Sequence, residues 1–205
     1  MIVAMPTNIP KRRDAEDDVR LIQEFKSGKE AAFTQLVQKY QQPVFNLLYH
    51  YSGRRQDVED LAQEVFIKVY TNLMKFETRA AFRTWLYRIT LNVSIDHARK
   101  QKRRRMLSLE GLTDWAKERL AFRIAAAPSP HSATERHELE TQIQRGLETL
   151  PEDFRQVLVL RDIEGMEYDD IAAILGWQLG TVKSRLFRAR QRLRKFLEPY
   201  VEDDK

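Results

Sequence analysis

Apolar residues recur at steps of three and four along most of the chain, which is the spacing of one face of an α-helix. No segment shows the period-two alternation of a half-buried strand. Pro43 falls inside the second apolar run and predicts a kink or a break there. In the first half of the chain these runs cover residues 19–25, 33–51, 58–73 and 82–98.

The last third of the chain continues the helical pattern in shorter pieces. Pro151 stands where a first helical residue is expected, and Gly165 and Gly176 stand where helices are expected to stop. A short helix, a turn that contains glycine and a longer helix together are typical of a helix-turn-helix. The predicted helices of this part cover residues 139–150, 154–163, 171–175 and 182–196.

Residues 107–134 separate the two helical parts and differ from both. They include the sequence AAAPSPHSAT, whose two prolines and small polar residues are typical of a linker. The sequence therefore predicts an all-α fold, with an N-terminal helical bundle and a C-terminal helix-turn-helix joined by a flexible linker. The predicted boundaries are a disordered tail 1–13, a first domain 14–106, the linker 107–134 and a second domain 135–200.

Charge is the next feature that narrows the function. The formal net charge is +5, and the basic residues gather in 99–105 and in the second helix of the helix-turn-helix, where no acid occurs from Thr181 to Lys195. Side chains near the N-terminal end of such a helix reach base edges in the major groove. A solvated basic helix packed on two others is the alternative. The position of the basic run favours binding of double-stranded DNA.

Composition excludes several kinds of chemistry. The chain has no cysteine, which rules out disulfides, thiol catalysis and thiolate zinc sites. It has no GxxxxGK[ST] phosphate loop and no HExxH motif, and its four histidines lack ligand spacing. We therefore expect no enzyme activity, catalytic residue, metal or cofactor. The apolar N-terminal run is too short for a signal peptide and no window could span a membrane, so we expect a cytoplasmic protein without membrane insertion.

The C-terminal motif resembles a known family. The sequences LPEDFRQVLVLRDIEGMEYDDIA, from Leu150, and GTVKSRLFRAR, from Gly180, resemble region 4 of bacterial sigma factors, in particular the small extracytoplasmic-function group. Trp177 and Gln178 stand where that family often has a small polar cap and a proline; because Trp is a poor N-cap, we expect a shifted or differently capped helix start. The resemblance implies that this domain recognises the −35 element through Thr181, Lys183, Ser184, Arg185, Phe187 and Arg188.

The helix DLAQEVFIKVY, from Asp60, resembles region 2.2, which docks on the clamp coiled coil of RNA polymerase. Its apolar stripe accounts for the core positions and leaves Asp60, Gln63 and Glu64 on other faces. On the residues alone these three are ordinary helix surface. The resemblance implies that they contact polymerase.

The segment FRTWLYRITLNVSIDHARK, from Phe82 to Lys100, resembles regions 2.3 and 2.4, which open and hold the −10 element. Aromatic and amide side chains can take unstacked bases while cations follow the backbone. The preceding loop stands where the family forms a pocket for an extruded base, and here it lacks the usual glycine. Trp85 is expected to pack in the core. The residues implied to bind the −10 element are Thr78, Arg79, Asn92, Asp96, Arg99 and Lys100.

These motifs together indicate a sigma factor that binds core RNA polymerase and directs it to promoters through duplex −35 DNA and the melted −10 element. The resemblance further implies an anti-sigma factor as a partner. A stand-alone helix-turn-helix regulator is the main alternative, and an enzyme with a DNA-targeting module is a third. A stand-alone regulator should bind promoter DNA tightly by itself, whereas a sigma factor should need core polymerase.

Overall fold

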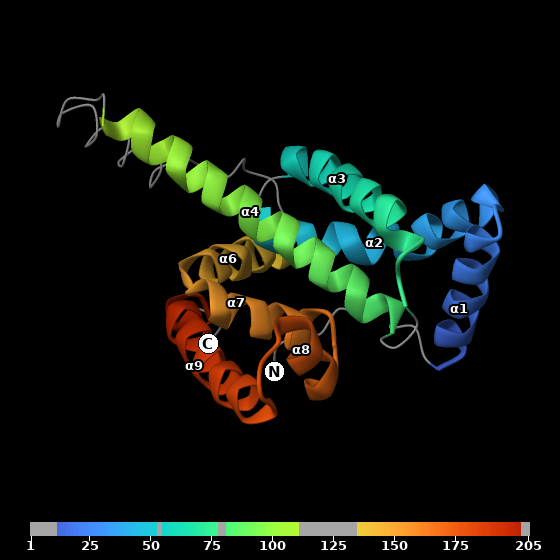
Figure 1. The fold of residues 1–205 in the computed structure, drawn as a ribbon. Coiled ribbons are helices and arrows are strands. Elements are labelled where there is room, and N and C mark those ends of the chain that lie inside the picture. The colour runs from blue at the N-terminus through green and yellow to red at the C-terminus, as the bar shows by residue number, and fades with distance from the viewer. Residues whose placement is uncertain (1–11, 53–54, 78–80, 111–134, 202–205) are drawn as a thin grey trace.

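The structure, a computed structural model, describes residues 12–52, 55–77, 81–110 and 135–201. Within these ranges it contains helices and no strand, in two groups that match the all-α, two-domain prediction (Figure 1). The N-terminal group comprises α1 (Arg12–Lys26), α2 (Glu30–Ser52), α3 (Arg55–Leu73) and α4 (Phe82–Glu110). The C-terminal group comprises α6 (Glu135–Thr149), α7 (Glu152–Leu158), the π-helical turn η1 (Val159–Ile163), α8 (Tyr168–Leu175) and α9 (Leu179–Val201).

Four local predictions differ from the structure. Helix α2 continues through Pro43 without a break, because Val44, Leu47 and Leu48 just after it are buried and hold both halves in one packed helix. Pro151 has φ −52° and ψ 147° and caps α7, so the helix begins one residue later. Helix α1 begins two residues inside the predicted tail, and α4 extends into the predicted linker, of which residues 111–134 lie outside the described part of the chain.

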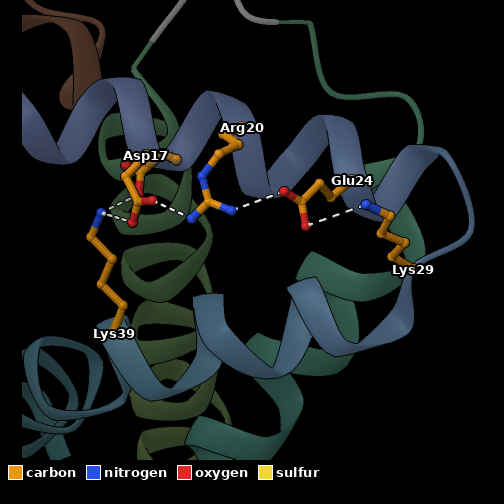
Figure 2. Close-up of polar contacts among 6 residues, drawn as sticks. Asp17, Arg20, Glu24, Lys29 and Lys39 are labelled. Carbon is orange, nitrogen blue, oxygen red and sulfur yellow. Dashed lines mark hydrogen bonds and ion pairs between the residues drawn. The ribbon is translucent and has the colours of Figure 1, made fainter.

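The N-terminal core is formed by the apolar stripes of α1 to α4. A buried polar contact supports it: the Tyr40 hydroxyl donates to Asp18 Oδ2 at 2.5 Å, and Lys39 Nζ lies 2.7 Å from Asp18 Oδ1. Because Asp18 is buried, these partners compensate its loss of water and fix α1 on α2. Figure 2 shows the chain of ion pairs that continues along the exposed side of α1, through Asp17, Arg20 and Glu24, to Lys29 in the turn before α2. Exposed pairs of this kind add little stability.

The C-terminal core packs α6, α7 and α8 around α9. Gly176 ends α8 in the left-handed conformation, with φ +67°, as the sequence predicts. At Gly146 of α6, a Cβ atom would lie 2.5 Å from Leu193 Cδ1 of α9. Any larger residue here would require the Leu193 and Phe196 side chains of α9 to shift.

The two domains are docked on each other, which the sequence did not predict. Helix α4 crosses the molecule with α2 and α3 on one side and the C-terminal helices on the other (Figure 1). Its Phe82, Leu86 and Val93 belong to the N-terminal core. Its Tyr87 and Leu91, with two residues of α2, belong to the C-terminal core. The domains thus share a continuous apolar interface through α4.

Polar contacts surround this interface. Arg83 lies 3.4 Å from Asp170 of α8, Arg88 donates to the carbonyl of Ala173, and the Tyr87 hydroxyl donates to Glu164 Oε2 at 2.9 Å. Glu164 is buried, and its Oε1 has no hydrogen-bond partner among the described residues. Burial raises the pKa of Glu164 to about 7, against the opposing effects of the Tyr87 hydrogen bond and the Arg83 charge.

Docking of the domains should weaken as the pH rises from about 4.5 to about 7. Undocking removes Tyr87 and opens the Glu164 carboxyl to water, where its pKa returns to an ordinary value near 4.5. Docking then takes up a proton in this window, so its equilibrium constant should fall by up to about tenfold per pH unit and level off above about pH 7. Because the chain has no cysteine, dyes on Glu59→Cys and Glu198→Cys can report the inter-domain distance by energy transfer. Glu164→Gln should remove this fall and leave the opposite dependence of His50, whose pKa burial lowers where it contacts Gln144 of α6. A fall with pH that persisted unchanged would contradict this assignment.

Candidate nucleic-acid and polymerase interface

Helix α9 presents one buried and one exposed face. Val182, Leu186, Ala189 and Leu193 are buried in the C-terminal core and hold the helix in place. The opposite face lies in solvent, and Phe187, an apolar side chain, is 63% exposed there. Of the residues predicted to bind the −35 element, Lys183, Ser184, Phe187 and Arg188 are exposed, and Thr181 and Arg185 are half-buried at the edges of that face.

The start of α9 is capped differently from the family pattern. The backbone carbonyl of Gln178 accepts from the amides of Thr181 and Val182, at 2.9 and 3.1 Å, so the helix starts after Gln178. Trp177 does not cap it. Its ring lies beneath the guanidinium of Arg185, with the Arg185 Cζ atom 4.1 Å from the ring centroid.

Other cations beside α9 also lie on aromatic rings. The Arg161 guanidinium is 4.6 Å from the centroid of Tyr168, Lys183 Nζ is 5.9 Å from the same ring, and the Arg192 guanidinium is 4.9 Å from Phe154. Sequence reasoning did not select Arg161 or Tyr168, since they precede the recognition helix and only the fold brings them to its side. The result is a row of oriented cations along both edges of the exposed face.

A cleft of about 570 Å³ lies between α3 and α4. The cleft is lined by Asn92 and Asp96, two of the residues predicted to bind the −10 element. These two residues therefore share a face of α4. Trp85 packs against Phe76, with ring centroids 4.8 Å apart, and also lines the cleft, so it serves the core only in part. The remaining lining residues are Lys68, Asn72, Lys75, Phe76 and Ile89.

The chemistry of this cleft suits an unstacked base with its phosphate. Aromatic rings offer a stacking surface, and Asn92 offers a donor and an acceptor together. Lys68 and Lys75 supply positive charge, which Glu64, paired with Lys68, and the Asp96 carboxylate offset in part. Sequence reasoning did not select Lys68, Asn72 or Lys75, because they come from α3 and the turn after it.

The other residues predicted to bind the −10 element lie apart from the cleft. Arg99 is exposed and its guanidinium is 3.5 Å from Glu152 of the C-terminal domain, while Lys100 is exposed further along α4. Thr78 and Arg79 lie outside the described residues. In the part of the chain that the structure describes, no group of three potential metal ligands occurs, and no helix is long and apolar enough to cross a membrane.

Helix α3 exposes the three residues predicted to contact polymerase. Asp60, Gln63 and Glu64 all point away from the N-terminal core, and Glu64 pairs with Lys68 at 2.8 Å. Exposed apolar side chains continue this surface, and sequence reasoning did not select them as contacts: the apolar pattern assigned Tyr70 to the core stripe, and the other two lie off it. They are Ile67, 63% exposed, Tyr70 and Met74. A charged and apolar surface of this kind is typical of a protein-binding site.

Comparisons with known proteins agree with this organisation. The family model for Sigma-70 region 2 matches residues 36–104, and the model for Sigma-70, region 4 matches residues 140–193. The RNA polymerase sigma-H factor of Pseudomonas aeruginosa is 37% identical over 188 residues, which cover 92% of this chain and 97% of that protein. The ECF RNA polymerase sigma factor SigW of Bacillus subtilis is 36% identical over 181 residues, covering 86% and 94%.

Two solved structures share the arrangement of helices. CnrH, in complex with the cytosolic domain of CnrY, has a TM-score of 0.65 and 27% identity and covers 89% of this chain and 98% of its own. The sigma factor RpoE of Bartonella quintana, in complex with the anti-sigma factor NepR, has a TM-score of 0.62 and 26% identity and covers 81% and 96%. Fold and matched regions together define a sigma factor of bacterial RNA polymerase. The chain belongs to the extracytoplasmic-function group of that family, whose members direct the polymerase to promoters.

Proposed function

We propose that this chain binds core polymerase through α3, places α9 in the major groove of the −35 element and holds a melted −10 strand in the cleft between α3 and α4. The observation that carries the proposal is the arrangement of α3. Its Asp60 to Glu64 surface faces outward, while Lys68 and Asn72, one and two turns further along, line the cleft. An opened strand would therefore lie directly beside the site of polymerase attachment. The chain itself makes no bond, and it acts where the polymerase does, in the cytoplasm.

Helix α9 has the form expected of a recognition helix. A B-DNA major groove is about 12 Å wide and admits one α-helix. In that position Arg188 and Ser184 would face base edges, and Phe187 suits the methyl group of a thymine. The ring-supported cations on either side, such as Lys183 and Arg192, would face the phosphates of the two strands.

The docked arrangement of the domains has to open for this function. The −35 and −10 elements are about 25 base pairs apart, or about 85 Å at 3.4 Å per pair. A docked chain of this length has a radius of gyration of about 17 Å. The two DNA-binding surfaces cannot reach both elements at once unless the contacts of α4 with α8 are released. The docked arrangement is therefore the one that the chain adopts when it is not bound to a promoter.

An anti-sigma factor is the further partner that we propose. Both similar structures are complexes with a second protein. CnrH is bound to the cytosolic domain of CnrY, and RpoE of Bartonella quintana is bound to the anti-sigma factor NepR. A partner of this class would cover the surfaces of α3 and α9 described above. If added before core polymerase, it should prevent the promoter complex from forming.

The exposed surface of α3 favours a sigma factor over a stand-alone regulator, and a promoter-shift experiment separates the two. The chain alone should bind promoter DNA weakly, and core polymerase should make binding tight. Glu64→Lys should weaken core binding by about tenfold or more, because it reverses a charge in the docking surface and places two cations beside each other. Glu148→Lys makes the same charge change at an exposed position of α6. It is the matched control and should bind core polymerase normally. Tight binding without polymerase would favour the regulator.

Arg188→Ala tests the placement of α9 in the groove. If Arg188 pairs with a guanine, its loss should weaken binding of the polymerase complex to the −35 element by about 1–3 kcal/mol and relax the preference for one base. Arg194→Ala, two turns further along the same helix and equally exposed, should reduce the salt dependence without changing base preference. Titrations against a set of −35 base substitutions measure both effects. An unchanged base preference in Arg188→Ala would show that α9 is misplaced.

A further inference from the structure

Arg185 is held more firmly than the cations in the middle of the exposed face of α9. Its guanidinium lies over the ring of Trp177, with Cζ 4.1 Å from the centroid. Its Nε lies 3.4 Å from Asp153 Oδ2, at the beginning of α7. By contrast, the exposed Arg188 side chain makes no hydrogen bond, ion pair or ring contact among the described residues. The fold therefore fixes the direction of one arginine and leaves its neighbour one turn away to adapt.

The position of Arg185 on the helix suggests what it contacts. One turn earlier lies half-buried Thr181 and one turn later lies buried Ala189, so Arg185 stands on the edge of the exposed face and its side chain is 34% exposed. Base edges lie beneath the centre of a recognition helix, whereas phosphates lie along its edges. Arg185 is therefore placed for a phosphate of the −35 element.

The two supports leave the guanidinium available for DNA. The Asp153 contact is given by Nε at 3.4 Å, and the guanidinium donates no hydrogen bond within the described residues. Stacking on the indole ring uses the flat face of the guanidinium and leaves its edge open. An arginine ordered in advance loses less conformational freedom when it binds a phosphate.

We propose that Trp177 is a positioning residue for promoter binding, which holds Arg185 toward a backbone phosphate of the −35 element. The proposal rests on the proposed function of α9. It also gives a role to a residue that departs from the family's usual cap: the backbone of Gln178 starts the helix, and the Trp177 side chain supports the arginine.

The test compares two replacements of Trp177 in the full chain bound to core polymerase. Trp177→Phe keeps an aromatic face, whereas Trp177→Leu keeps apolar packing and removes that face. The affinity for promoter DNA is measured over a range of salt concentrations, and the slope of log K against log salt counts phosphate contacts at about 0.9 each. Thermal melting of each variant shows whether it is folded.

We expect Arg185→Ala and Trp177→Leu to weaken promoter binding equally, by about three- to tenfold near 0.1 M salt, and to reduce the slope by about one phosphate contact. The double variant should be no weaker than either single variant, since both changes remove the same contact. Trp177→Phe should restore most of the affinity and the slope. Base preference at the −35 element should stay unchanged in all of them.

Three results would overturn the inference, and they are distinguishable from failure of the function itself. Normal binding by Trp177→Leu, with Arg185→Ala weakened, would show that the indole does not position Arg185. Equal losses in Trp177→Phe and Trp177→Leu with lowered melting temperatures would show a packing role only. Altered base preference in Arg185→Ala would assign Arg185 to a base. If Arg185→Ala and Arg188→Ala both left promoter binding unchanged, the proposed function of α9 would itself be wrong.

Discussion

The structure depends on one helix that is buried on two sides. Helix α4 contributes Phe82, Leu86 and Val93 to the N-terminal core, and Tyr87 and Leu91 to the C-terminal core. A third side, with Asn92 and Asp96, remains open as a wall of the cleft. Burial of apolar surface on both sides fixes the direction of α4. The cleft, the docking of the C-terminal domain and the approach to α3 all follow from that direction.

In the proposed function, binding to a promoter requires the two domains to separate, so it opposes their docking on each other. The docked state gains apolar contacts of α4 but buries Glu164, whose carboxyl has one hydrogen-bond donor, Tyr87, and a second oxygen that no group of the described residues contacts by a hydrogen bond. Such an interface is poorly compensated near neutral pH, where that carboxyl begins to ionise. Because no residue of the cleft takes part in these contacts, opening would separate the domains without rebuilding either site. A domain interface of limited stability suits a protein that must extend along DNA.

The sequence predicted most helices well because their apolar residues keep a helical period and their ends carry glycine or proline. Gly176 is an example, since its left-handed conformation ends α8 where expected. Pro43 was misleading, because tertiary packing on both sides of it outweighs the lost hydrogen bond. The docking of the domains was not predicted. The apolar period of α4 indicates one buried face, and Tyr87 and Leu91 lie off it. Only the fold shows that they form a second buried face.

The grouping of candidate site residues could be predicted where they share one helix, as with Asn92 and Asp96, which line one cleft, or with Ser184 and Arg188, which are both exposed. They were not predictable where distant segments meet. Lys68 reaches the cleft from another helix, and the ring of Trp177, in the turn between α8 and α9, lies against Arg185 two turns into α9. Side-chain contacts of this kind depend on helix crossing angles, which no local pattern contains.

The central claim is that this chain supplies promoter specificity to RNA polymerase, and run-off transcription with purified core polymerase tests it most directly. Transcripts should start at defined positions on templates that carry the chain's promoters and should depend on both its addition and an intact −35 element. Glu64→Lys should lower their amount through loss of core binding. If core polymerase gave the same transcripts with and without the chain, on templates that the chain binds tightly by itself, the account would be contradicted.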